Sequence, residues 1–178
     1  MCVPGQRTNP GPLYRMPFGA LFASPATVPL VGAVEGCLTA YLEGLCDECG
    51  LTAAGTRFGA SQFAQAAFAR AASEVDATAL PLDRDIAELY TCAARSETSP
   101  LELRLRTRRD QVCGTERAVR VIDQLFSHAV SALQSGNRVE RVWRDVHAGS
   151  THFPNDVEHV LALYGGGVLG LPVEDVLM

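Results

Sequence analysis

The sequence contains no lysine, so all 15 of its Lys/Arg positions are arginines. It also contains 20 acidic residues, and the formal net charge is −5. Without a lysine ε-amino group the chain cannot perform Schiff-base chemistry. The acidic balance, together with the absence of any long block of like charge, gives no field that would gather nucleic acid or an anionic membrane. We therefore expect neither nucleic acid nor a membrane as a partner.

Long apolar runs and a metal-binding pattern are also missing. No stretch approaches the ~20 consecutive apolar residues that cross a bilayer, and the first residues do not have the pattern of a secretory signal. The six cysteines are scattered, and Cys46 and Cys49 have no second pair to complete a metal set. His128, His147 and His159 also lack a metal-site spacing. We expect a cytoplasmic protein with mostly reduced cysteines and no metal.

No convincing alternation of polar and apolar residues predicts a β-strand. Apolar residues instead recur at spacings of three and four, which is typical of helices with one buried face. The 178 residues, 47% of them hydrophobic, suit one domain with a single core. The predicted fold is all-α, an antiparallel four-helix bundle.

The principal helices are expected near residues 29–49, 60–79, 99–134 and 155–168, with a short helix in Val139–His147. The third is predicted to be the central helix, because its apolar pattern repeats over three heptads. Residues 83–95 form either a shorter helix or an extension of the second helix beyond a kink at Pro81. The prolines near the start predict an extended lead-in over residues 1–28, followed by the bundle domain over 29–178.

Three segments carry a family likeness: the run Leu13–Gly19 with the start of the first helix, the arginine-rich helix from Leu101 to Phe126, and the run Val139–His152. In order and spacing they resemble the C-terminal domain of the acyl-CoA dehydrogenase superfamily. The likeness is to its branch of flavin-dependent monooxygenases, the oxygenase components of two-component hydroxylases. Members are roughly twice as long. Their N-terminal helical domain and middle β-domain are expected to be absent here.

The resemblance implies a site around His152. A histidine at this place faces the flavin and handles a proton of the substrate, while the alternative for His152 is a packed or solvated side chain. Ser150 and its small neighbours leave space for a ligand, so Ser150 is a candidate flavin contact. Many acyl-CoA dehydrogenases carry a catalytic glutamate just after this Arg-Asp pair, but residues 146–155 contain no carboxylate, which favours the oxygenase branch.

Four arginines, Arg104, Arg106, Arg108 and Arg109, cluster at the start of the long helix. Arg104 and Arg108 are the candidate contacts to a flavin phosphate. The alternative is a solvated helix face with ion pairs to Glu97, Glu102 and Asp110.

Three residues next to the candidate site are expected to be structural. Arg144 and Asp145 should tie their short helix to its neighbours. Trp143, the only tryptophan, should pack in the core.

The resemblance predicts a subunit of a split flavin-dependent monooxygenase that hydroxylates a small organic substrate, aromatic or polyketide-like. The cofactor would be reduced FAD or FMN, bound only with a partner chain that supplies the other domains. The alternative is a repurposed, flavin-free bundle that acts as a cyclase, a small-molecule binder or an interaction partner. A remnant that still folds is a third reading. In each case a homo-oligomer or hetero-oligomer is expected.

Overall fold

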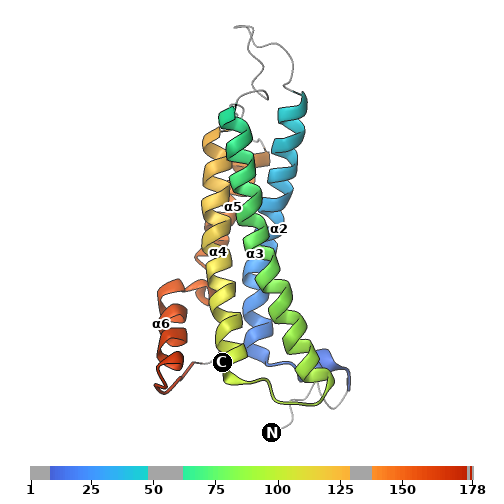
Figure 1. The fold of residues 1–178 in the computed structure, drawn as a ribbon, viewed down its shortest axis with the longest axis vertical. Coiled ribbons are helices and arrows are strands. Elements are labelled where there is room, and N and C mark those ends of the chain that lie inside the picture. Colours follow the sequence, from blue (N-terminus) through green and yellow to red (C-terminus); the bar gives the residue numbers. More distant parts are fainter. Residues whose placement is uncertain (1–8, 48–61, 129–137, 176, 178) are drawn as a thin grey trace.

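The computed structural model describes residues 9–47, 62–128, 138–175 and 177. Within these ranges the chain forms five α-helices and two short 3-10 helices, and no β-strand. Four helices form an antiparallel bundle, and the fifth lies beside it (Figure 1). The bundle helices are α2 (Phe18–Asp47), α3 (Gln62–Ala94), α4 (Leu101–His128) and α5 (Arg138–Ser150). The predicted fold class is confirmed.

The extended lead-in predicted for residues 1–28 is wrong over most of its described length. A 3-10 helix, η1 (Pro12–Arg15), is followed by α2, which begins at Phe18 and contains Pro25 and Pro29. Both prolines face solvent, while the buried face of the helix continues past them through Ala23, Thr27 and Val31. Packing of that face outweighs the missing backbone donor at each proline.

α3 runs without a break through Pro81 to Ala94, so residues 83–95 extend the second helix rather than form a separate one. Its buried face continues on both sides of the proline, from Val75 through Leu82 to Leu89. The same argument from packing applies.

α4 is the central helix, as predicted, because it contacts all four of the other described α-helices. Its buried face includes Val112, Thr115 and Ile122. The predicted end near residue 134 lies outside the described residues, as do the side chains of Cys46 and Cys49.

The fourth helix of the bundle is α5 and not the predicted helix near 155–168. α5 packs against α2 and α4, and its Val139 and Val146 belong to the main core. α6 (Val157–Val168) packs on the outer side of α4 (Figure 1). Its N-cap is Asp156, whose carboxylate accepts a hydrogen bond from the His159 backbone N–H at 3.1 Å.

One helix is more apolar than the sequence pattern indicated. The part of α2 from Phe18 to Glu43 is long and apolar enough to cross a membrane by length and composition. Its buried face, with Val34, Cys37 and Leu38, packs into the main core of the bundle. A core helix of a bundle meets the same criteria, so this segment is weak support for a membrane span.

Candidate functional site

A buried polar network lies where α2, α4 and the 3-10 helix η3 (Phe153–Asn155) meet. Gln111 Nε2 donates to Thr27 Oγ1 at 2.7 Å and to Asn155 Oδ1 at 2.5 Å, and the hydroxyls of Thr27 and Thr115 are 2.7 Å apart. Asn155 Nδ2 donates to the Gly149 carbonyl at 3.0 Å. Buried polar groups that are all hydrogen-bonded define one arrangement. The network therefore fixes η3, and the residues just before it, against the bundle.

Arg108 extends this network with a buried charge. Its Nη1 donates to the Pro154 carbonyl at 3.1 Å and to the side-chain oxygen of Gln111. Only 4% of Arg108 is exposed, and this burial lowers the pKa of its guanidinium, against the opposing effect of the Asp175 charge. A largely buried positive charge therefore lines the pocket that lies beside η3.

The pocket beside η3 has a volume of about 600 Å³ and contains three of the four predicted site residues. It is lined by Arg108, Ser150, Thr151, His152, Phe153, Asn155, Asp156, His159, Val160, Asp175 and Leu177. The Ser150 hydroxyl donates to the His147 carbonyl at 2.8 Å, which leaves its oxygen lone pairs for a ligand. We call this the His152 pocket.

His152 is exposed and lines this pocket. Its ring lies 5.4 Å from the ring of Phe153, and its imidazole makes no hydrogen bond with any other described residue. Its backbone N–H donates to the Gly149 carbonyl at 3.2 Å, which places the residue just after the end of α5.

The structure separates Arg104 from the other three predicted residues. Arg104 lines a second pocket of about 550 Å³ at the start of α4, together with Arg15, Ser96 and Ser99. Its Nε atom is enclosed and has no hydrogen-bond partner among the described residues. Arg104 and Arg108 are therefore not neighbours in one binding site.

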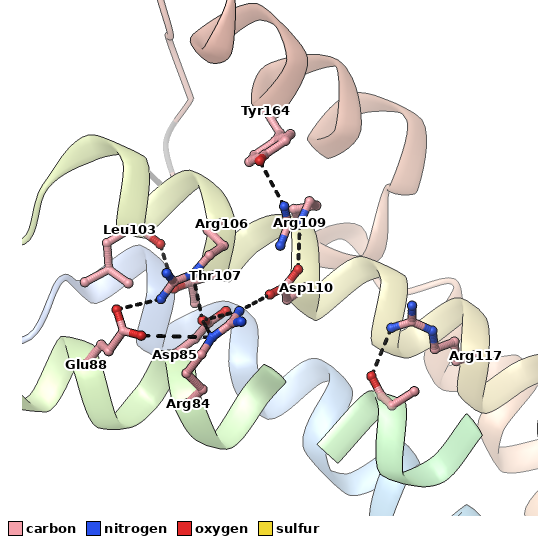
Figure 2. A network of polar contacts seen from close by, with 11 residues as sticks. Arg84, Asp85, Glu88, Leu103, Arg106, Thr107, Arg109, Asp110, Arg117 and Tyr164 are labelled. Carbon is pink, nitrogen blue, oxygen red and sulfur yellow. Dashed lines mark hydrogen bonds and ion pairs between the residues drawn. The ribbon is translucent and has the colours of Figure 1, made fainter. Parts of the chain in front are cut away.

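The remaining two arginines of the cluster form ion pairs (Figure 2). Arg106 binds Asp85 at 2.9 Å and Glu88 at 2.7 Å, both on α3. Arg109 binds Asp110 at 2.6 Å and donates to the Tyr164 hydroxyl at 2.9 Å. The predicted pairing with Asp110 is confirmed, and the other acidic partners come from α3.

The ion-pair network joins three helices. Arg84 bridges Asp85 at 2.9 Å and Asp110 at 2.7 Å, which links α3 to α4. The Arg109 guanidinium lies 4.7 Å from the centre of the Tyr164 ring, which attaches α6 to α4. Burial raises the pKa of Asp85, and hydrogen bonding from Arg84 only partly opposes it. These groups hold α6, which carries one wall of the His152 pocket.

Two pocket residues that could take part in proton transfer, His159 and Asp175, are not among the predicted site residues. His159 Nε2 lies 2.8 Å from Asp175 Oδ2, and the other Asp175 oxygen accepts the Leu177 backbone N–H at 2.5 Å. Burial acts to raise the pKa of Asp175, but the hydrogen bonds from Leu177 and His159 and the Arg108 charge outweigh it and lower that pKa. The Asp156 cap marks the start of α6 and places His159 in its first turn, but no local signal pairs His159 with Asp175.

The structural roles expected beside the site are partly confirmed. Trp143 packs against the main core, and its Nε1 donates to Asp123 at 2.7 Å. Arg144 pairs with Glu140 of the same helix at 3.0 Å, so this ion pair stabilises α5 itself. Within the described residues no group of three or more His, Cys, Asp or Glu side chains could hold a metal ion.

Residues 25–156 match the family described as acyl-CoA dehydrogenase, C-terminal domain. The chain belongs to this family. The resemblance seen in the three sequence segments is thereby confirmed, and the relatives reported next are oxygenase subunits.

Over its whole length the chain is 37% identical to the flavin-dependent monooxygenase oxygenase subunit HsaA of Rhodococcus jostii (strain RHA1). The match covers 47% of that relative. It is 35% identical to the subunit of the same name from Mycobacterium tuberculosis (strain ATCC 25618 / H37Rv). That match covers 98% of this chain and 44% of the relative. The chain thus spans less than half the length of these relatives.

Solved structures of similar proteins have the same fold. The crystal structure of 3-HSA hydroxylase from Rhodococcus sp. RHA1 superimposes with a TM-score of 0.92 over 98% of this chain and 45% of that one, at 38% identity. XiaF from Streptomyces sp., solved in complex with FADH2 and glycerol, gives a TM-score of 0.83 over 92% of this chain and 42% of its own, at 24% identity. At that identity XiaF supports the fold alone.

Proposed function

We propose that this chain is the C-terminal part of the active site of a flavin-dependent monooxygenase. It would hydroxylate a small organic substrate, aromatic or polyketide-like, and another polypeptide would supply the N-terminal and middle domains. The observation that carries the proposal is the His152 pocket, which gathers His152, Ser150 and Arg108. The similarity of the whole chain to oxygenase subunits supports it.

Part of the pocket lining suits a planar, negatively charged cofactor, although Asp156 and Asp175 also line the pocket. Arg108 offers a buried positive charge, and Ser150 offers hydroxyl lone pairs. The exposed ring of Phe153 lines the pocket, and its centre lies 5.8 Å from that of the Phe22 ring. The centres of the Phe22 and Phe18 rings are 5.6 Å apart. Aromatic surfaces of this kind stack on flat rings. Reduced FAD or FMN, when bound, would supply the electrons that activate oxygen, and Arg108 and Ser150 would hold its polar edge.

His152 would handle a proton of the reaction beside the bound cofactor, the role that the resemblance implies for it. An imidazole nitrogen with an available lone pair can accept a proton and return it. Its ring has no hydrogen bond to another described residue, so its nitrogens are available to a ligand. The hydrogen bond from Asn155 to the Gly149 carbonyl fixes the backbone from which His152 projects. The partner domain would exclude water from the exposed side of the ring.

The test is to co-express this chain with the N-terminal and middle domains of the R. jostii relative. We expect the complex to retain flavin and, with a reductase, to hydroxylate members of a set of substituted phenols that includes 4-nitrophenol. Each polypeptide alone serves as a control and should do neither. A complex that forms but neither binds flavin nor hydroxylates any phenol would contradict the proposal and favour the flavin-free bundle.

A further inference from the structure

The C-terminal segment forms part of the wall of the His152 pocket. The chain turns at Gly170, whose φ of +77° lies in the left-handed region that glycine adopts without strain. It then runs from the end of α6 back to the base of the bundle (Figure 1). Leu177 is buried there against Gly19. Asp175 and Leu177 consequently face the same pocket as His152.

Asp175 holds His159 through one carboxylate oxygen and the chain end through the other. Its side chain is 8% exposed, whereas that of His159 is 53% exposed. With Asp175 as the acceptor at 2.8 Å, a neutral His159 carries its proton on Nε2 and keeps a lone pair on Nδ1. That Nδ1 makes no hydrogen bond with the described residues. In enzymes that use histidine as a general base, a carboxylate commonly fixes the tautomer of that histidine, and Asp175 and His159 have this arrangement.

His152 lacks such support, since no described carboxylate or carbonyl accepts from its ring. Of the two pocket histidines, only His159 has its tautomer set by a neighbour. Arg108 lines the same pocket, and its charge would stabilise a ligand oxygen that has lost its proton.

We propose that His159 is a second proton acceptor in the pocket and that Asp175 is the residue that positions it. The ligand is a phenol or a similarly acidic hydroxyl compound, and this identity rests on the proposed function. In the step, the ligand O–H bond breaks, the proton binds Nδ1 of His159, and the electron pair stays on the ligand oxygen. The Asp175 carboxylate keeps its hydrogen bond from Nε2 and stabilises the imidazolium.

The positioning role is tested on the chain alone, without flavin, by nitrogen NMR of the histidine tautomers. The His159→Gln variant assigns the signals. In the wild type, neutral His159 should carry its proton on Nε2. In Asp175→Asn the carbonyl can still accept from Leu177, but the amide NH2 now donates to Nε2, so the proton should move to Nδ1. Glu158→Gln removes the charge of an exposed residue next to His159 and should leave the tautomer unchanged. The same tautomer mixture in wild type and Asp175→Asn would overturn the positioning role.

The proton-acceptor role is tested in the co-expressed complex with the phenol that the wild type hydroxylates. His159→Gln and Asp175→Asn should lower kcat by on the order of 10²-fold with little change in KM, the pattern expected when an interaction of the transition state is lost. Glu158→Gln should match the wild type. An active wild type with equally active variants would reject His159 as acceptor and leave the proposed function standing. An inactive wild-type complex would contradict the proposed function, and the tautomer measurement alone would then decide on Asp175.

Discussion

Gly19, in the first turn of α2, lies directly against the backbone of Leu177 near the end of the chain. A Cβ atom at position 19 would come within 2.1 Å of the Leu177 carbonyl oxygen and 2.3 Å of its carbonyl carbon. No side chain fits in that space while the two backbones remain in place. This contact fixes the C-terminal segment, and with it Asp175, over the His152 pocket.

Replacing Gly19 with alanine should therefore displace the C-terminal segment. We expect Gly19→Ala to lower the free energy of unfolding by about 1–3 kcal/mol, the usual cost of overpacking, and to speed hydrogen exchange at Leu177. Gly32→Ala is the matched control, because a Cβ at this exposed position in α2 meets nothing within 4 Å. The control should be more stable than the wild type by about 0.5–1 kcal/mol, since alanine favours a helix interior. Equal urea unfolding curves for the two variants would contradict the contact.

Asp85 should make the stability depend on pH in a defined direction. Burial raises its pKa, so the folded chain binds this proton more tightly than the unfolded chain. Its contribution to stability is then complete below the ordinary value of 3.8 and is lost as the pH rises through the raised pKa. As the pH rises through the raised pKa, the free energy of unfolding of the wild type should decrease relative to that of Asp85→Asn. Urea unfolding at several pH values measures this difference. Asp83→Asn, an exposed substitution on the same helix, should follow the wild type. Identical pH profiles for wild type and Asp85→Asn would refute the prediction.

His152→Ala should spare the fold, because the side chain is exposed on the pocket wall. In the co-expressed complex it should lower hydroxylation by on the order of 10²-fold, the scale for a positioned acid or base. Reduced flavin should still bind, and oxygen should oxidise it with release of hydrogen peroxide instead of hydroxylated product. His147→Gln is the control, because His147 lies outside the pocket and its Nδ1 is 2.8 Å from the Trp143 carbonyl. Unchanged coupling of flavin oxidation to product in His152→Ala would remove this residue from the mechanism.

The chain should associate with copies of itself or with a partner. Large apolar side chains are exposed at several places, among them Phe63 at 85%, Leu169 at 79% and Phe18 at 71%. Apolar surface of this kind marks an interface when it is contiguous, as in the aromatic row from Phe18 to Phe153. Light scattering of the purified chain should give a dimer or tetramer. A stable monomer of 19.0 kDa at micromolar concentration would be the contrary result.

The spacing of apolar residues was sufficient to predict the helices, but not their ends. Pro25, Pro29 and Pro81 each indicate a break when only the backbone of the proline and its neighbours is considered. The three prolines lie inside helices because the buried faces of α2 and α3 continue across them, and that packing exists only in the folded bundle. The choice of α5 over α6 as the fourth bundle helix also depends on contacts between distant segments.

The sequence by itself determined the helical class, the family and the candidacy of His152, because each follows from the order of residues along one segment. Only the tertiary structure decided which side chains share a pocket. Arg104 and Arg108 are one helical turn apart on α4, yet that rise of about 6 Å carries them into different pockets because different segments cover each position. His159 and Asp175 meet because the chain reverses at Gly170 and Leu177 packs against Gly19, a return path that no local spacing encodes.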